Sequence, residues 1–174
     1  MNRCVAAAFV VACVSAHGFV AADDKDAAKL ITVELKSFKF EPKDPGVPGD
    51  LLGYQDDQGR LFFYINGTAE ATVKLPAEGD YTIVVNAACD SALNEKAKFK
   101  LSIDGKLIDK ETTLTSDDPK DYSFTATLKA GERKLKIEFT NDVYKENEYD
   151  RNLYVHEVKI RPPAKKLEKE KDKK

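Results

Sequence analysis

The sequence contains no tryptophan, one methionine and three cysteines in 174 residues. Cys4 and Cys13 fall in an apolar N-terminal run, so Cys89 is the single cysteine of the remaining chain. An intramolecular disulfide is therefore excluded for the expected mature protein. Cys89 continues the period-two pattern of residues 81–87, which predicts a small buried side chain and not a nucleophile.

Signatures of catalysis are also missing. His156 is the single histidine beyond residue 22, and the sequence has no GxSxG motif, phosphate-binding loop or zinc-ligand spacing. These absences disfavour nucleophilic, phosphoryl-transfer and zinc-dependent chemistry. A glycosidase needs only two suitably placed carboxylates, so that class stays open. We expect no enzyme, because one small domain offers no obvious catalytic cleft.

The longest apolar run, CVAAAFVVACV, has about eleven residues, too few to cross a bilayer. With Arg3 before it and Val20-Ala21-Ala22 after it, residues 1–22 are predicted to be a signal peptide. We expect an exported protein, secreted or periplasmic. The alternative is a lipid anchor on Cys13, because Val10-Val11-Ala12-Cys13 resembles a bacterial lipobox.

Short runs rich in β-branched and aromatic residues fill the middle of the chain, and no stretch has a sustained helical period. The predicted strands are 31–40, 61–65, 68–75, 81–89, 98–103, 122–128, 134–140 and 153–160. This pattern predicts an all-β fold, an antiparallel β-sandwich or jelly roll, as a single domain over residues 30–161. Residues 23–29 are a predicted linker, and residues 162–174 a disordered charged tail.

Three details sharpen this prediction. Residues 41–60 are dense in proline and glycine and are expected to form a long loop. Asn66-Gly67 is typical of a hairpin turn. Leu153 and Val155 are out of phase with Val158 and Ile160, which predicts a β-bulge near His156 and Glu157.

Charged residues make up 33% of the chain, with a formal net charge of −2. The expected folded part has an acidic excess, and the C-terminal tail has a basic one. An acidic body disfavours nucleic acid as the partner. We expect a monomer.

An acidic segment lies between the strands predicted at 134–140 and 153–160. It contains the carboxylates of Asp142, Glu146, Glu148 and Asp150 against a single Lys145. Such a density of oxygen donors favours calcium, whereas zinc would need cysteine or histidine ligands. The alternative is an ordinary solvated surface loop.

The string ND-x7-DRNLYV in this segment resembles the signature of the calcium-dependent xylan-binding carbohydrate-binding modules. The resemblance implies a β-sandwich in which a loop-bound calcium ion coordinates sugar hydroxyls directly. The implied metal ligands are Asp142, Asp150 and the backbone carbonyl of Tyr149, with Asp90 and Glu95 as further ligands. The implied carbohydrate contacts are Tyr144, Tyr149, Asn147 and Glu148.

The expected function is therefore secreted, calcium-dependent binding of xylan or a related polysaccharide with vicinal hydroxyls, without catalytic activity. The lack of tryptophan fits, because calcium-mediated recognition does not depend on an aromatic platform. One alternative is an envelope or matrix interaction protein with at most structural calcium. Another is a small carbohydrate-active enzyme. For Glu95, an ion pair with Lys96 or Lys98 remains an alternative to metal binding.

Overall fold

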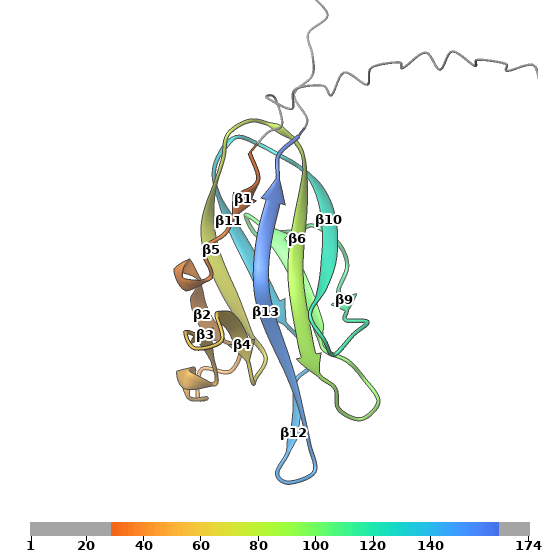
Figure 1. Ribbon diagram of the computed structural model, residues 1–174. Coiled ribbons are helices and arrows are strands. Elements are labelled where there is room, and N and C mark those ends of the chain that lie inside the picture. Colours follow the sequence, from red (N-terminus) through yellow and green to blue (C-terminus); the bar gives the residue numbers. More distant parts are fainter. Residues whose placement is uncertain (1–28, 164–174) are drawn as a thin grey trace, which may run out of the picture.

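The computed structural model describes residues 29–163, which form two facing antiparallel sheets (Figure 1). The first sheet runs in the order β10 (Lys120–Leu128), β6 (Gly79–Asp90), β13 (Tyr149–Arg161), β4 (Arg60–Phe63) and β3 (Leu52–Gln55), and β1 (Ile31–Thr32) and β12 (Val143–Lys145) pair with β13. The second runs β2 (Lys39–Pro42), β5 (Gly67–Leu75), β11 (Gly131–Phe139), β7 (Lys98–Ile103) and β8 (Lys106–Leu107), and β9 (Thr112–Thr113) pairs with β7. The predicted β-sandwich is confirmed.

Strict alternation of apolar and polar residues builds the core between the sheets. On β11, Leu135, Ile137 and Phe139 are fully buried, whereas the residues between them are lysine and glutamate. Phe63 of the first sheet meets Phe139 of the second edge-on, with ring centroids 6.4 Å apart. Cys89 lies in this core, 3% exposed, as the sequence predicted.

Strand β13 is the longest element and positions the candidate site. It pairs with β6 over most of its length, with β4 and β1 on its other side, and with β12 beyond the sheet. The register against β6 shifts between Val155 and Glu157, so the predicted bulge is confirmed. The extra residue, His156, lets Leu153 and Val155 point into the same core as Val158 and Ile160.

The prediction of one strand over residues 31–40 was wrong. β1 and β2 belong to different sheets, and the 3-10 turn η1 (Leu35–Ser37) joins them, with the Ser37 hydroxyl donating to the Glu34 carbonyl at 2.6 Å. The prediction of a long loop over 41–60 was also wrong in part. This segment contains the end of β2, the 3-10 turn η2 (Gly49–Leu51) and β3, which pairs with β4.

Asn66-Gly67 is not a hairpin turn, because it joins β4 and β5, which lie in different sheets. A side chain at Gly67 would not fit: its Cβ would lie 2.8 Å from both the Glu41 carbonyl oxygen and a Leu52 methyl carbon. The glycine is needed here for close approach of the backbone, not for reversal of the chain.

The two ends of the described chain, Lys29 and Pro163, lie at one end of the sandwich, and the β12–β13 hairpin extends from the other (Figure 1). Packing continues to Pro162, which is buried, and Pro163, which lies against Gly79. Within residues 29–163, no helix is long and apolar enough to span a membrane. The predicted signal peptide, most of the linker, the possible anchor on Cys13 and residues 164–174 of the tail lie outside the described residues.

Candidate functional site

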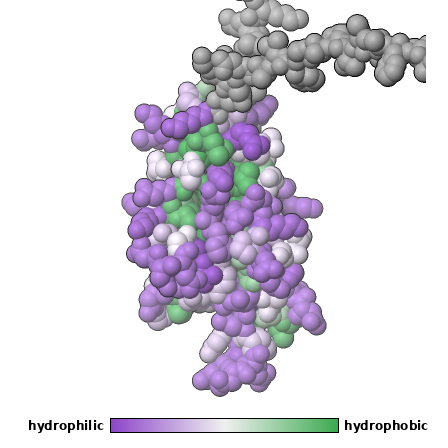
Figure 2. Space-filling model, in the orientation of Figure 1, coloured by the Kyte–Doolittle hydropathy of each residue, from purple (hydrophilic) through white to green (hydrophobic). Residues whose placement is uncertain are grey.

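The acidic segment singled out in the sequence forms the β12–β13 hairpin. Tyr144 pairs with Asp150, and a tight turn closes the tip, where the Glu148 amide donates to the Lys145 carbonyl at 3.0 Å. Asn147 adopts φ = 60°, a conformation that asparagine tolerates better than most residues. The hairpin surface is strongly hydrophilic (Figure 2).

The backbone of Asp142 is anchored at the point where the chain enters the hairpin. Its backbone amide donates to Asn66 Oδ1 at 2.8 Å, which anchors the segment to the connection between β4 and β5. Its carboxylate oxygen Oδ1 is buried and has no hydrogen-bond partner within the described residues. Burial, and next the charge of Asp150, raise the pKa of Asp142 to about 6, although the nearby Arg151 opposes this shift. The carboxylate therefore lies where a cation would be strongly favoured.

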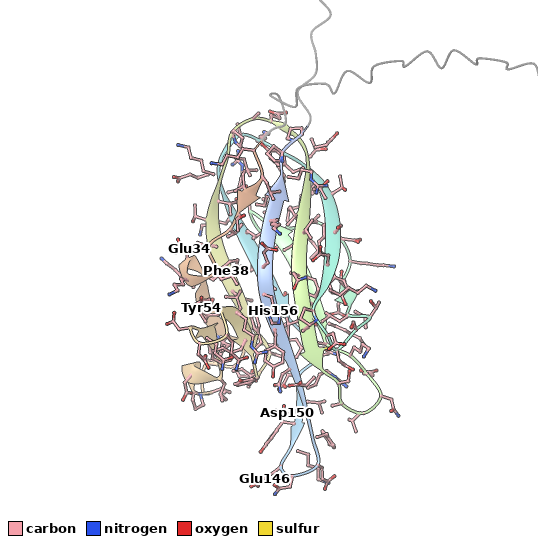
Figure 3. The ribbon with its side chains drawn as sticks, in the orientation of Figure 1. Glu34, Phe38, Tyr54, Glu146, Asp150 and His156 are labelled. Carbon is pink, nitrogen blue, oxygen red and sulfur yellow. The ribbon has the colours of Figure 1, made fainter. Side chains whose placement is uncertain are left out.

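A cleft of about 560 Å³ opens beside these two carboxylates. Its lining residues are Leu51, Tyr64, Ile65, Asp142, Tyr144 and Asp150. Tyr144 is 64% exposed, so one of its ring faces is available to a ligand. Figure 3 shows Glu146 at the hairpin tip and Asp150 nearer the sheet. The cleft thus combines negative oxygens with aromatic walls.

A buried amide joins Asp150 to Asp90 on the neighbouring strand. Asn152, which is 4% exposed, donates from Nδ2 to Oδ2 of both carboxylates at 3.0 Å. The Tyr154 hydroxyl donates to the same oxygen of Asp90 at 2.6 Å. Burial and this bond to Asp90 raise the pKa of Tyr154. The arrangement fixes the orientation of both carboxylates.

Arg151 ties the hairpin to the loop between β6 and β7. Its side chain is buried, and it donates to the backbone carbonyls of Ala92, Glu95 and Asn141 at 2.5, 3.2 and 2.6 Å. The Asn141 side chain completes the connection, because it accepts from the Lys98 amide at 2.7 Å and donates to the Lys96 carbonyl at 3.0 Å. Each residue of the string DRN therefore has a structural role. Asp150 places its carboxylate in the cleft, Arg151 anchors the loop between β6 and β7, and Asn152 joins the carboxylates of Asp150 and Asp90.

The predicted residues divide into three groups. Asp142, Asp150 and Tyr144 meet in the cleft. Asp90 is joined to them through Asn152. The remaining predicted residues lie elsewhere: Glu95 pairs with Lys98 and Arg151, Glu148 pairs with Lys145, Asn147 is at the tip, and Tyr149 opens β13 half-buried.

Sequence reasoning missed Tyr64 and Leu51, because both lie far from the motif in the chain and reach the cleft only through the order of the strands. It also missed the anchoring residues Asn66 and Arg151. In residues 29–163, no three side chains of the His, Cys, Asp and Glu types converge as a ready metal site. A cation here would draw its remaining ligands from backbone carbonyls, water or hydroxyls.

Comparison with known proteins finds a family model that matches residues 82–173, more than half of the chain. Its description is "Ca-dependent carbohydrate-binding module xylan-binding". A search of curated proteins finds no significant match.

Several solved structures share the fold. The C-terminal family 6 carbohydrate-binding module of a marine laminarinase from Zobellia galactanivorans is 11% identical, with a TM-score of 0.54, over 76% of this chain and 99% of that one. A family 36 module of a xylanase from the hindgut metagenome of Trinervitermes trinervoides is 14% identical, with a TM-score of 0.54, over 78% and 98%. A family 35 module from Clostridium thermocellum is 13% identical, with a TM-score of 0.50, over 78% and 100%.

Proposed function

Because the chain belongs to the family of calcium-dependent, xylan-binding carbohydrate-binding modules, we propose that it binds xylan or a similar polysaccharide through a calcium ion held at the Asp142–Asp150 cleft. It does so without catalysing a reaction. The protein is exported, either secreted or periplasmic, and acts as a monomer that comprises one domain over residues 30–161. The alternative is an exported protein that stays attached to a membrane through a lipid on Cys13.

One observation carries this proposal: the buried Oδ1 of Asp142 has no partner in the described part of the chain, and a second carboxylate lies beside it. An ionised oxygen is costly to bury alone, because the protein interior screens charge poorly. A calcium ion relieves that cost, since it accepts six to eight oxygen ligands in irregular geometry. The all-oxygen chemistry of the cleft therefore fits calcium.

The ligands proposed for the ion are the carboxylates of Asp142 and Asp150 and the backbone carbonyl of Tyr149. Asp90 contributes through its free oxygen Oδ1, because Oδ2 is already taken by Asn152 and Tyr154. Glu95 is the weakest of the proposed ligands, since its carboxylate lies 3.6 Å from Arg151 and 3.8 Å from Lys98.

Bound calcium would supply a positive centre at which two vicinal sugar hydroxyls replace water. The chain's own residues position the sugar and the carboxylates. Tyr144 presents an exposed ring to the C–H face of a sugar, and the network through Asn152 keeps the carboxylates in place. Tyr149, Asn147 and Glu148 offer further hydrogen bonds from the hairpin.

Titration of xylo-oligosaccharide into calcium-loaded and chelated protein tests the proposal. Binding should need calcium, and magnesium should replace it poorly, because magnesium demands octahedral geometry and loses water reluctantly. Asp150→Ala should abolish binding, whereas Glu146→Ala, which removes an acid from the tip of the same hairpin, should leave it intact. Equal affinity with and without calcium would contradict the proposal and favour an envelope or matrix protein in which calcium has at most a structural role.

Release of reducing sugar by the purified protein would instead favour a small carbohydrate-active enzyme. We expect none, since the cleft carboxylates are proposed to hold the ion and are not free to transfer protons.

A further inference from the structure

A second group of polar side chains follows the cleft along the outer face of the first sheet. The Arg60 guanidinium lies over the Tyr154 ring, with 3.8 Å between its central carbon and the ring centroid. Tyr154 meets Tyr64 edge-on at 6.3 Å, and Tyr64 lines the cleft. A continuous strip of side chains therefore joins the cleft to Arg60.

No ion pair among the described residues neutralises the positive charge of Arg60. Within residues 29–163, its one hydrogen bond runs from Nε to Gln55 Oε1 at 3.1 Å, and it forms no ion pair. On the adjoining turn and strand, Asp56 pairs with Lys36 at 2.6 Å and Glu157 pairs with Lys159 at 2.5 Å, and among the described residues Asp57 forms no ion pair with Arg60. Both terminal nitrogens of the guanidinium are left without a partner in the described structure.

His156 lies within the electrostatic influence of Arg60. Burial and then the charge of Arg60 lower its pKa, and its Nε2 is buried without a hydrogen-bond partner in the described chain. His156 borders a groove of about 290 Å³, and Tyr54, Gly59 and Glu157 lie on the same groove. Glu34 and Lys36 also line this groove and carry opposite charges. Figure 3 shows His156 on β13 at the level of Tyr54.

A planar guanidinium with two open nitrogens matches a carboxylate, which accepts two parallel hydrogen bonds from it. Stacking on Tyr154 holds the plane of Arg60 and reduces the entropy lost on binding. A lysine would not give the same recognition, because its ammonium group is a point charge.

We propose that Arg60, stacked on Tyr154, binds the carboxylate of an acidic sugar residue in the same polysaccharide that the cleft holds. The inference rests on the proposed function and adds a preference for uronic acid substituents. Tyr154 lies four residues from Asp150 along β13, which corresponds to roughly 13 Å at ~3.3 Å per residue. The cleft and Arg60 are thus close enough to engage one polysaccharide chain, at sugars that are not directly adjacent in its backbone.

The test compares three xylo-oligosaccharides of equal length on calcium-loaded protein: unsubstituted, carrying one glucuronic acid, and carrying the same sugar with its carboxyl group reduced to an alcohol. The acidic ligand should bind about fivefold more tightly than the other two, as expected for a half-buried ion pair, and roughly 500 mM salt should diminish the difference. Its carboxylate should also shift the His156 imidazole resonances, whereas the reduced ligand should not.

Two variants separate recognition from folding. Arg60→Gln should remove the preference for the acidic ligand while neutral binding and the melting temperature stay unchanged. Arg60→Lys should keep part of the preference, since the charge remains but the paired donors are lost. Equal affinity for acidic and reduced ligands, or a preference that survives in Arg60→Gln, would overturn the proposal.

The unsubstituted oligosaccharide keeps this test separate from that of the proposed function. If it binds and the acidic ligand has no advantage, only the Arg60 subsite is refuted. If neither binds, both proposals are refuted. If free glucuronate shifts His156 as strongly as the acidic oligosaccharide at equal concentration, the anion belongs to a separate ligand, and the proposal is overturned.

Discussion

Two charged segments lie side by side at one end of the sandwich, and their carboxylates have different partners (Figure 1). In the loop between β6 and β7, residues 91–97, charges meet opposite charges: Lys96 pairs with Asp117 at 3.0 Å, and Glu95 pairs with Lys98 and Arg151. In the β12–β13 hairpin, Asp142 and Asp150 have no such partner among the described residues, although Arg151 is near. The binding segment therefore differs in two ways: it has more acids, and two of its carboxylates have no oppositely charged partner in the described chain.

The largest effect is expected where the two segments are joined. Arg151→Met removes the donor to three backbone carbonyls, which are then left without partners, so the free energy of unfolding should fall by about 3–5 kcal/mol. Urea unfolding measures this. Arg133→Met is the control: Arg133 is half-buried and donates to the backbone carbonyls of Lys129 and Ala130, which are exposed to solvent, so its loss should cost only about 1 kcal/mol. A comparable small loss for Arg151→Met would show that the segments do not depend on this anchor.

Asp142→Asn should act in opposite directions with and without calcium. It should abolish the rise in melting temperature that calcium produces, a stabilisation of about 2.7 kcal/mol at a hundredfold excess over Kd. In chelated protein at pH 7 it should instead raise stability, since it removes a buried charge and its repulsion with Asp150. A destabilised chelated variant would contradict this account of the hairpin.

The pH dependence of the chelated protein provides a further check on the same carboxylate. The folded state raises the pKa of Asp142 to about 6, so it retains a proton that the unfolded state has lost from about pH 4 upward. The contribution of Asp142 to stability is therefore lost as the pH rises through about 6. The advantage of Asp142→Asn over the parent should be small at pH 4 and largest at pH 7, as followed by thermal unfolding at each pH.

The aromatic side chains of the hairpin should have an intermediate effect, on affinity alone. Tyr144→Ala should weaken oligosaccharide binding by about 1–3 kcal/mol, because its exposed ring borders the cleft. Tyr149→Ala should weaken it less, since Tyr149 does not border the cleft. Calorimetric titration compares the two variants. A larger loss of affinity in Tyr149→Ala than in Tyr144→Ala would indicate that the sugar binds to the other face of the hairpin.

The smallest effect is expected in the loop with paired charges. Glu95→Gln should lower stability by less than about 1 kcal/mol and weaken calcium binding only slightly, because its carboxylate is exposed and already paired. Calcium titration followed by thermal unfolding tests this. A large loss of calcium affinity would show that Glu95 turns from Arg151 to the ion, and the contrast between the two segments would disappear.

The sequence was enough to predict the sandwich, most of its strands, the bulge at His156 and the segment that holds Asp142 and Asp150. These features have local signals: alternation of polarity, a phase change and a motif. β3 was missed because its proline- and glycine-rich surroundings are typical of a loop. The division of residues 31–40 between two sheets depends on pairing with distant strands, and no local sequence pattern indicates that pairing.

The site was predicted less completely, for a related reason. The carboxylates belong to a motif, but Tyr64, Asn66 and Arg60 come from β4 and its flanks, about 75 to 90 residues earlier in the chain. Their proximity follows from the pairing of β13 with β4. The neighbours of Glu95 in sequence could not decide whether it forms an ion pair or binds the metal, because its second partner, Arg151, is remote in the chain and buried.

Both described chain ends lie at the end of the sandwich opposite the hairpin (Figure 1). A tag, a bead or a fused protein joined at either end therefore points the cleft outward and does not obstruct it. Strands β6 and β13 act as a spacer, because an extended strand of 13 residues keeps the cleft about 40 Å from the attachment point. Immobilisation at the ends of the described range, residues 29 and 163, should accordingly preserve capture of insoluble polysaccharide, whereas random coupling through the surface lysines should not.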